Sequence, residues 1–512
     1  MKTQKGHIIQ IFCGRTLVII LLLLIQLLFF FAVVRFLSQY IPYFLGSYIL
    51  FTAAMLIYVM NTHQDPTIKL SWCFIIAVIP VFGILLYLFT DLDLGHRTEQ
   101  KLLQQIEKES AVYVMEPKKL MAQIQEEDKG FCHIADYALK NGFPIYQNTH
   151  VTHFPLGEQM LEELLLQLEQ ASSFIFLEYF IVEEGYMWGK VLNTLAKKAK
   201  EGVEVRVMYD GTCSFMTLPY NYPEKMQKLG IQCKAFAPIH AFVSTHYNNR
   251  DHRKILVIDG HTGFTGGVNL ADEYINRRQK HGHWKDTAVM LKGEAVRTLT
   301  LLFLQMWNIS EREHIYEPYF IPVDRGLRQE EGYVLPYGDS PLDDERIGEM
   351  IYLDILNTAQ DYVYIMTPYM ILDHQMMTAM TFAAKRGVNV KLILPSKSDS
   401  LFTVALAKSH YLELTRAGVE IYEYLPGFVH AKQFVSDNQK AVVGTINLDY
   451  RSLYLHFECA VYLYQTPAVQ DILEDFQVTL AKCKKVTLEE IQNERLFVKL
   501  AGSLLKLAAP LM

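Results

Sequence analysis

The chain has 512 residues, enough for a hydrophobic N-terminal region followed by two ordinary domains. Its formal net charge of −7 excludes a globally basic protein that would attract nucleic acid. The seven cysteines are scattered without a C-x-x-C pair, so the sequence indicates neither a zinc site nor a disulfide framework.

Three uncharged apolar runs open the chain, at residues 16–34, 41–60 and 70–90. About 20 apolar residues are enough for an α-helix to cross a bilayer. We therefore predict N-terminal transmembrane helices within residues 1–90 and a multi-pass protein of the cell membrane. The sequence does not settle which face of the membrane carries the remaining chain.

After a polar, helical connector at 91–145, the same order of elements occurs twice. The β-like run 173–182 leads to a helical stretch and a buried strand, and the run 361–372 does the same in the second half. Strand–helix–strand alternation predicts α/β domains with largely parallel sheets covered by helices. We assign residues 146–325 to the first domain, 326–485 to the second and 486–512 to a C-terminal amphipathic helix.

One longer template, H-x-K-x4-D-x6-G-x2-N, stands at the same place in each half. A single H-x-K-x4-D would be weak evidence, but two extended copies in a repeated unit exclude coincidence. The first copy comprises His252, Lys254, Asp259, Gly266 and Asn269, and the second comprises His430, Lys432, Asp437, Gly444 and Asn447.

Residues two apart in a strand point to the same face, so the His and Lys of each copy project side by side. If the halves pack about a pseudo-twofold axis, two imidazoles, two ammonium groups and two Asn amides meet in one cleft. This set suits a phosphodiester, because the cations stabilise the charge that develops on phosphorus oxygens. One imidazole would attack phosphorus while the other transfers protons, and the two similar motifs do not settle which does which.

Carboxylates are expected to orient the imidazoles, and the candidates are Asp286 and Glu458, in matching places downstream. The offset of seven residues from His places Asp259 and Asp437 on the opposite strand face, so we expect structural support from them. The site residues include no cluster of metal ligands, and the lysines would supply the positive charge. We therefore expect no metal and no cofactor.

These segments resemble the phospholipase D superfamily, whose signature is the paired H-x-K-x4-D motif. Within it, the chain is similar to bacterial cardiolipin synthases along nearly its whole length. The segments that carry this similarity are "LEYFIV", "NNRDHRKILVIDG", "GGVNLADEY", "HWKDT", "YLPGFVHAK" and "GTINLDYRS". Two residues depart from the family pattern, His456 and Asp251, where the family often has Asn.

The resemblance implies a metal-independent phosphatidyl transfer that converts two phosphatidylglycerol molecules to cardiolipin and glycerol. It implies His252 as the nucleophile, His430 as the acid and base, and Lys254, Lys432, Asn269 and Asn447 as phosphate ligands. The implied partners are phosphatidylglycerol and membrane lipids of the bacterial cytoplasmic membrane, and no nucleic acid. A phospholipase D hydrolase, or a phosphatidyl transferase with another acceptor alcohol, would share the same site.

Overall fold

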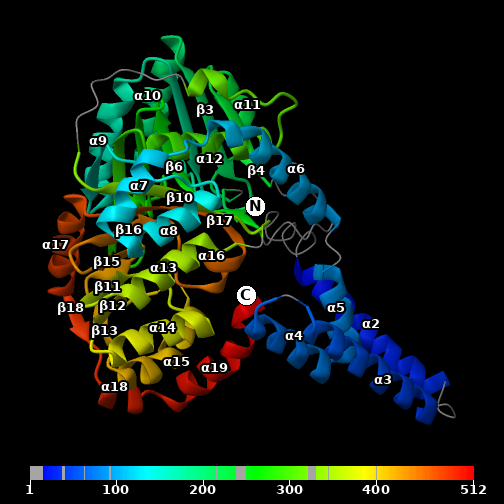
Figure 1. The fold of residues 1–512 in the computed structure, drawn as a ribbon. Coiled ribbons are helices and arrows are strands. Elements are labelled where there is room, and N and C mark those ends of the chain that lie inside the picture. The colour runs from blue at the N-terminus through cyan, green and yellow to red at the C-terminus, as the bar shows by residue number, and fades with distance from the viewer. Residues whose placement is uncertain are drawn as a thin grey trace. The chain divides into compact units, whose positions relative to one another are not determined.

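The computed structural model describes residues 15–36, 41–62, 64–91, 94–214, 216–237, 249–320, 330–343, 345–398 and 400–511. The chain forms two compact units. We call the first the helical unit; it comprises Met1–Glu99, Ile239–Asn248 and Ser503–Met512. The second, the sheet unit, comprises Gln100–Pro238 and Asn249–Gly502 and contains the strands labelled in Figure 1. Both H-x-K-x4-D motifs lie within it.

The helical unit contains α2 (Arg15–Phe36), α3 (Ile41–Met60), α4 (Pro66–Val78) and α5 (Pro80–Asp91). The prediction of transmembrane helices is wrong: within the described ranges, no helix combines the length and apolar character needed to cross a bilayer. The run 70–90 shows one physical reason. The chain leaves helical geometry at Ile79, with φ −133°, and Pro80 starts a new helix. The resulting helices of 13 and 12 residues are each about 20 Å long, against about 30 Å of hydrocarbon.

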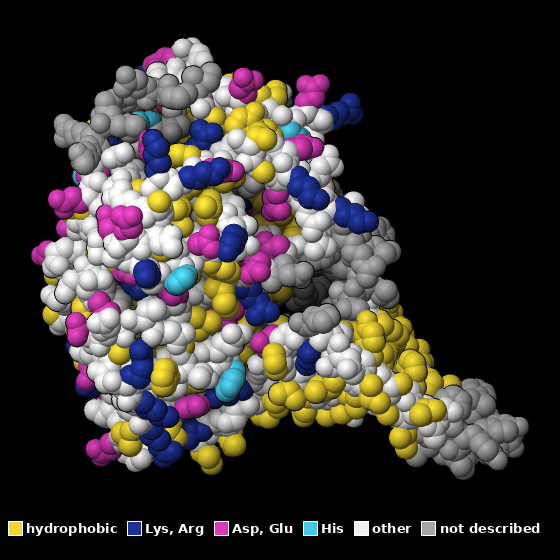
Figure 2. All heavy atoms as spheres, viewed as in Figure 1, with side chains coloured by type: hydrophobic (Ala, Val, Ile, Leu, Met, Phe, Trp, Pro, Cys, Tyr) yellow, Lys and Arg dark blue, Asp and Glu magenta, His cyan; other side chains and the backbone are white. Residues whose placement is uncertain are grey.

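Exposed apolar side chains gather on the helical unit (Figure 2). Leu28 of α2, Leu50 of α3 and Leu70 of α4 are each exposed over more than half of their surface, at 65%, 73% and 61%. Val59 of α3, Ile76 of α4 and Tyr87 of α5 belong to a small core between these three helices.

The sheet unit is built on two large sheets with the same strand order. The first runs β1 (Thr149–Phe154), β9 (Ala288–Gly293), β7 (Thr262–Gly266), β6 (Lys254–Ile258), β2 (Phe174–Tyr179), β3 (Glu204–Asp210) and β4 (Gln232–Phe236). The second runs β10 (Tyr333–Asp339), β17 (His456–Tyr464), β16 (Lys440–Gly444), β15 (Gln433–Ser436), β11 (Tyr362–Met366), β12 (Asn389–Pro395), β13 (Glu420–Tyr424) and β18 (Cys483–Lys485). Element for element, the second sheet repeats the first and adds β18 at its edge.

Both sheets are mixed, so the prediction of largely parallel sheets is wrong. Along the two strand orders above, β2–β3–β4 and their equivalents β11–β12–β13 pair in parallel. The other neighbours in these two orders are antiparallel. The reason lies in the motif itself. Asp259 and Gly260 turn the chain with φ 52° and 64°, and β7 follows β6 directly as a hairpin. A parallel pair would need a crossover of a dozen or more residues there.

Two short pairings join the halves of the sheet unit. Strand β5 (Arg250–Asp251) of the first half pairs in parallel with β17 of the second half. Strand β8 (His283–Lys285) of the first half pairs in parallel with β14 (Gly427–Val429) of the second. Each of these strands lies directly beside a residue of the expected site.

Helices cover the sheets and fill the space between them. The outer face of the second sheet carries α13 (Ile347–Thr358), α14 (His374–Lys385) and α15 (Leu401–Ala417) (Figure 1). The first sheet carries α9 (Gly157–Glu169), α10 (Tyr186–Lys200) and α11 (Tyr222–Gln227). A third core unites both sheets around α12 (Val296–Asn308) and α17 (Ala468–Leu480).

The predicted connector 91–145 contains α6 (Leu94–Ser110), the 3-10 turn η2 (Ala111–Tyr113), α7 (Lys118–Glu127) and α8 (Lys129–Lys140). Phe131 and Ile134 of α8 are buried in the core of the second sheet. The predicted domain boundary at 325 lies outside the described residues. The remaining elements are η4 (Asp272–Ile275), η5 (Glu317–Tyr319), α16 (Tyr450–Tyr454), α18 (Leu488–Gln492), α19 (Leu496–Ala508) and η6 (Ala509–Leu511).

Candidate active site

Both motif histidines lie at the head of equivalent strands. His252 stands between β5 and β6, and His430 stands between β14 and β15. Lys254 is the first residue of β6, and Lys432 directly precedes β15. All four side chains are buried, and the two histidines keep only 5% and 6% of their surface exposed.

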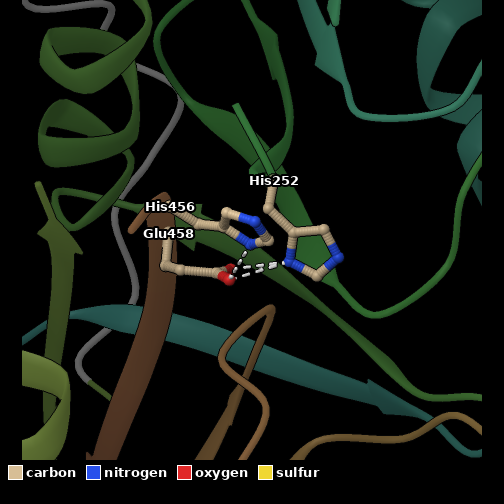
Figure 3. Close-up of side chains that lie close together, drawn as sticks. All are labelled: His252, His456 and Glu458. Carbon is tan, nitrogen blue, oxygen red and sulfur yellow. Dashed lines mark hydrogen bonds and ion pairs between the residues drawn. The ribbon is translucent and has the colours of Figure 1, made fainter. Parts of the chain in front are cut away.

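Each histidine pairs with a carboxylate from the other half. His252 Nδ1 lies 2.9 Å from both carboxylate oxygens of Glu458, which stands on β17 (Figure 3). His430 Nδ1 lies 2.6 Å from Asp286 Oδ2, just after β8. Because a carboxylate accepts only, each Nδ1 carries the proton and each Nε2 keeps its lone pair when the imidazole is neutral.

The two backbone pairings between the halves explain why each histidine contacts a carboxylate from the other half. Next to the β5–β17 pairing, the His252 amide donates to the Phe457 carbonyl at 2.9 Å, which sets His252 beside Glu458. Next to the β8–β14 pairing, the His430 amide donates to the Lys285 carbonyl at 2.7 Å, which sets His430 beside Asp286. The main chain therefore brings each imidazole to its carboxylate.

The surroundings favour neutral imidazoles and ionised carboxylates. Burial lowers the pKa of His252 to about 3 and that of His430 to about 4, against the opposing pull of their carboxylates. Burial alone would raise the pKa of Glu458, but the imidazoles of His252 and His456 hold it well below its usual range. The pKa of Asp286 is likewise low, because its interactions with His430 and Lys432 outweigh burial.

The pKa values of the two lysines lie near neutral pH, well below the usual value for lysine. Burial lowers the pKa of Lys254 to about 8 and that of Lys432 to about 7, and the charge of Lys254 lowers the latter further. Lys254 Nζ donates to the His252 carbonyl at 2.5 Å, and Lys432 Nζ lies 2.9 Å from His430 Nδ1. A bound anion would favour the protonated form of both lysines, so the two side chains are suited to bind an anionic group.

The motif aspartates lie at the other end of the strands. Asp259 and Asp437 both have φ 52°. The Asp259 carboxylate accepts hydrogen bonds from the three consecutive amides of residues 172–174, at the start of β2. Asp437 does the same with the amides of residues 360–362, before and at the start of β11. In both halves the carboxylate ties the motif hairpin to its neighbouring strand.

The two motif asparagines differ in their contacts. Asn269 Oδ1 accepts from the Ile181 amide at 3.1 Å, and its Nδ2 donates to the Tyr274 hydroxyl at 2.8 Å. Asn447 is 5% exposed, and its Oδ1 has no hydrogen-bond partner among the described residues. The Asn269 amide is therefore largely engaged within the protein, whereas Asn447 retains a free acceptor.

The motif glycines end β7 and β16, where neighbouring strands approach closely. A Cβ on Gly266 would lie 2.5 Å from the Ala288 Cα, and one on Gly444 would lie 2.3 Å from the Ala460 Cβ. Gly266 also has φ 151°, a conformation that other residues rarely adopt. These glycines let β7 and β16 pack against β9 and β17, and each asparagine lies three residues beyond the end of its strand.

Three further residues complete the surroundings of His252, and sequence reasoning did not place them in the site. The Thr445 hydroxyl donates to Glu458 Oε2, and the Phe180 ring packs edge-on against His252 with centroids 4.6 Å apart. His456 lies 5.4 Å from His252 between ring centroids (Figure 3). Its position two residues before Glu458 places it on the same face of β17, a signal that the sequence does contain.

The protein families that match this chain cover the two halves of the sheet unit and part of the helical unit separately. A family described as "Cardiolipin synthase, PLD-like domain" matches residues 164–307 and 352–480, and one described as "Phospholipase_D-nuclease N-terminal" matches 50–90. An uncharacterized protein of Streptococcus mutans is 49% identical over 89% of this chain and 99% of its own length.

Two further relatives carry the name cardiolipin synthase. That of Halalkalibacterium halodurans is 31% identical and that of Alkalihalophilus pseudofirmus 32% identical, each over 90% of this chain and 91% of its own length. The fold is similar to the crystal structure of phosphatidylserine synthase from Haemophilus influenzae. That likeness has a TM-score of 0.56 at 14% identity and covers 74% of this chain and 97% of that one.

Proposed function

Because the chain belongs to the cardiolipin synthases of the phospholipase D superfamily and is a phosphatidyl transferase, we propose that it joins two phosphatidylglycerol molecules into cardiolipin and releases glycerol. The observation that carries this proposal is the reciprocal pair of buried imidazole–carboxylate contacts beside two lysines. Two such pairs supply one nucleophile and one proton carrier, which a two-step phosphatidyl transfer requires.

In the first step, His252 Nε2 attacks phosphorus of the first phosphatidylglycerol and the bond from phosphorus to the glycerol oxygen breaks. Glu458 holds the Nδ1 proton and stabilises the positive charge that the imidazole gains. The His430 imidazolium gives its Nε2 proton to the leaving glycerol oxygen. Burial and Lys432 keep His430 neutral in the free site, and the charge of a bound phosphodiester together with Asp286 favours the imidazolium.

In the second step, the hydroxyl of a second phosphatidylglycerol attacks the phosphohistidine. Neutral His430 Nε2 takes its proton, the bond between phosphorus and nitrogen breaks, and His252 returns to its neutral state. Lys254 and Lys432 stabilise the charge on the phosphoryl oxygens in both steps. The low exposure of both histidines, 5% and 6%, supports transfer over hydrolysis because it limits the access of water.

Both substrates are lipids, so we expect the enzyme to work at a lipid surface. The C-terminal helix α19 supports this, since Leu496, Phe497 and Leu500 are exposed at 72%, 81% and 56%. On the other side, α19 rests on α15, where a Cβ on Gly502 would lie 2.6 Å from the Ala405 carbonyl. An amphipathic helix with exposed Leu and Phe fits the interface of a bilayer.

The test is mass spectrometry of the lipids formed from phosphatidylglycerol alone, in EDTA, by the wild type and by His252→Asn and His430→Asn. Cardiolipin with an equal amount of glycerol, from the wild type only, is the expected result. Phosphatidic acid as the main product would instead identify a hydrolase with water as the acceptor.

A second measurement assigns the two histidines. Peptide mapping of the rapidly quenched wild type should find the phosphatidyl adduct on His252, because the first step leaves the phosphatidyl group on the nucleophile. An adduct on His430 of the wild type, with none on His252, would reverse the two roles.

A further inference from the structure

A third buried imidazole stands beside the pair formed by His252 and Glu458, and the proposed reaction does not use it. His456 is 8% exposed, and its Nδ1 lies 3.5 Å from Glu458 Oε1, longer than an ordinary hydrogen bond. Neither of its ring nitrogens has a hydrogen-bond partner among the described residues. Burying a polar group without a hydrogen bond costs free energy. His456 faces Glu458 at a distance too long for a hydrogen bond, and a ligand bound between them would satisfy both groups (Figure 3).

We propose that His252, His456 and Glu458 form an inhibitory binding site for Zn²⁺ or a similar transition-metal ion. Each offers one ligand atom, and these three atoms lie within 4.8 Å of one another. Two imidazoles and one carboxylate are a ligand set typical of zinc sites that keep a fourth position open.

The spacing suits tetrahedral coordination. Zinc bonds of about 2.0–2.2 Å place neighbouring ligand atoms about 3.3 Å apart. The His252 Nδ1 to Glu458 distance is 2.9 Å, and the His456 Nδ1 to Glu458 distance is 3.5 Å. Small side-chain rotations therefore bring all three atoms onto one ion, and the fourth position is left for water.

The inhibitory effect follows from the tautomer of His252, and it rests on the proposed role of this residue as nucleophile. The metal-free site keeps the proton on Nδ1, which donates to Glu458, and leaves the lone pair on Nε2. A metal on Nδ1 needs the lone pair there, so the single proton of the neutral imidazole moves to Nε2. Without a lone pair on Nε2, His252 cannot bond to phosphorus.

The positive charge of Lys254 limits the affinity for the metal, and the types of ligand atom determine which metal ions bind. Lys254 Nζ lies 2.5 Å from the His252 carbonyl, and its positive charge opposes a second cation nearby. We therefore expect weaker binding than in a structural zinc site. Mg²⁺ and Ca²⁺ prefer oxygen ligands and should not inhibit at the same concentrations, whereas imidazole suits Zn²⁺ and Co²⁺.

The experiment titrates the full-length protein with buffered free Zn²⁺ and follows cardiolipin formation relative to each variant's own metal-free rate. His456→Asn should raise the half-inhibiting zinc concentration at least tenfold, and Mg²⁺ should leave the wild type unaffected. Equal zinc sensitivity of His456→Asn and the wild type would overturn the proposal.

Two readouts do not depend on activity. Co²⁺ should give the visible absorption of a tetrahedral site in the wild type, and Zn²⁺ should raise its unfolding midpoint. Both signals should be lost in His456→Asn, and His456→Gln guards against a folding defect of one variant. Both signals should persist in His430→Asn, which is expected to be inactive but keeps all three ligands.

These outcomes separate the metal site from the reaction. A His456-dependent Co²⁺ spectrum in a protein that makes no cardiolipin would support the site while the proposed function fails. A spectrum unchanged by His456→Asn, or lost in His430→Asn, would place the metal elsewhere and refute the site whatever the reaction.

Discussion

Replacing Glu458 with glutamine tests the electrostatic role of the carboxylate behind His252. The amide oxygen of the introduced side chain would still accept the Nδ1 proton, so the ring keeps its orientation while the negative charge is lost. Glu458 lies 2.9 Å from His252 Nδ1, and the ring becomes cationic when Nε2 bonds to phosphorus. With both charges spread over several atoms, about 4 Å apart on average, an effective dielectric of about 20 gives about 4 kcal/mol. The turnover number should therefore fall about a thousandfold.

The assay measures the initial rate of cardiolipin formation by mass spectrometry at saturating phosphatidylglycerol, beside the unfolding midpoint of each variant. The matched control is Glu489→Gln, an exposed carboxylate on α18, which should not change the rate. A rate for Glu458→Gln within tenfold of the wild type, in a folded protein, would refute the charge argument and with it the nucleophilic role of His252.

Four further predictions concern the lysines, the motif turns, the glycines and the C-terminal helix. Burial lowers the pKa of Lys432 to about 7, and the proposed phosphate contact needs the protonated form, so kcat/KM should fall as the pH rises through about 7 to 8. In Lys432→Arg this alkaline limb of the pH profile should move upward, and an unmoved limb would exclude Lys432 as the titrating group. Asp259→Ala removes the acceptor of three backbone amides and should lower the free energy of unfolding by about 2–4 kcal/mol with little change in turnover per folded molecule; a large loss of turnover at full stability would indicate a chemical role. Gly444→Ala should destabilise by at least about 2 kcal/mol in urea unfolding, because its Cβ would lie 2.3 Å from a neighbouring Cβ, whereas Gly189→Ala meets nothing within 4 Å and should be neutral or stabilising. Phe497→Glu should weaken binding to phosphatidylglycerol vesicles at least fivefold while leaving activity on detergent-dispersed substrate intact, and unchanged vesicle binding would remove α19 from the lipid-contacting surface.

The repeated template could be recognised from the sequence because local rules govern it. Alternation along a strand places His252 beside Lys254, and the same rule applies to His430 and Lys432. The carboxylates were harder to place. Asp286 and Glu458 could be named from their matching positions, but not assigned to a histidine. The pairs join residues 144 and 206 positions apart, and that choice is made by backbone pairing between the halves.

The predictions of transmembrane helices and of parallel sheets were wrong because hydropathy and the order of elements do not show where single residues end a helix or turn a strand. The run 70–90 has the hydropathy of a spanning helix, yet Pro80 divides it into two short ones. Strand–helix alternation suggested parallel sheets, yet the turn at Asp259 and Gly260 folds the first motif strand back as a hairpin, and Asp437 and Asn438 do the same in the second half. The Asp–Gly pair is a hairpin signal that a reading of element order alone overlooks.

The exchange of carboxylates between the halves has a consequence for the time at which this enzyme becomes active during its synthesis. Glu458 leaves the ribosome 206 residues after His252. At about 5–20 residues per second, that interval lasts about 10–40 s. The first half can form its own sheet in that time, but its histidine has no carboxylate behind it. On the proposed mechanism, a chain that still lacks Glu458 should therefore not transfer phosphatidyl groups.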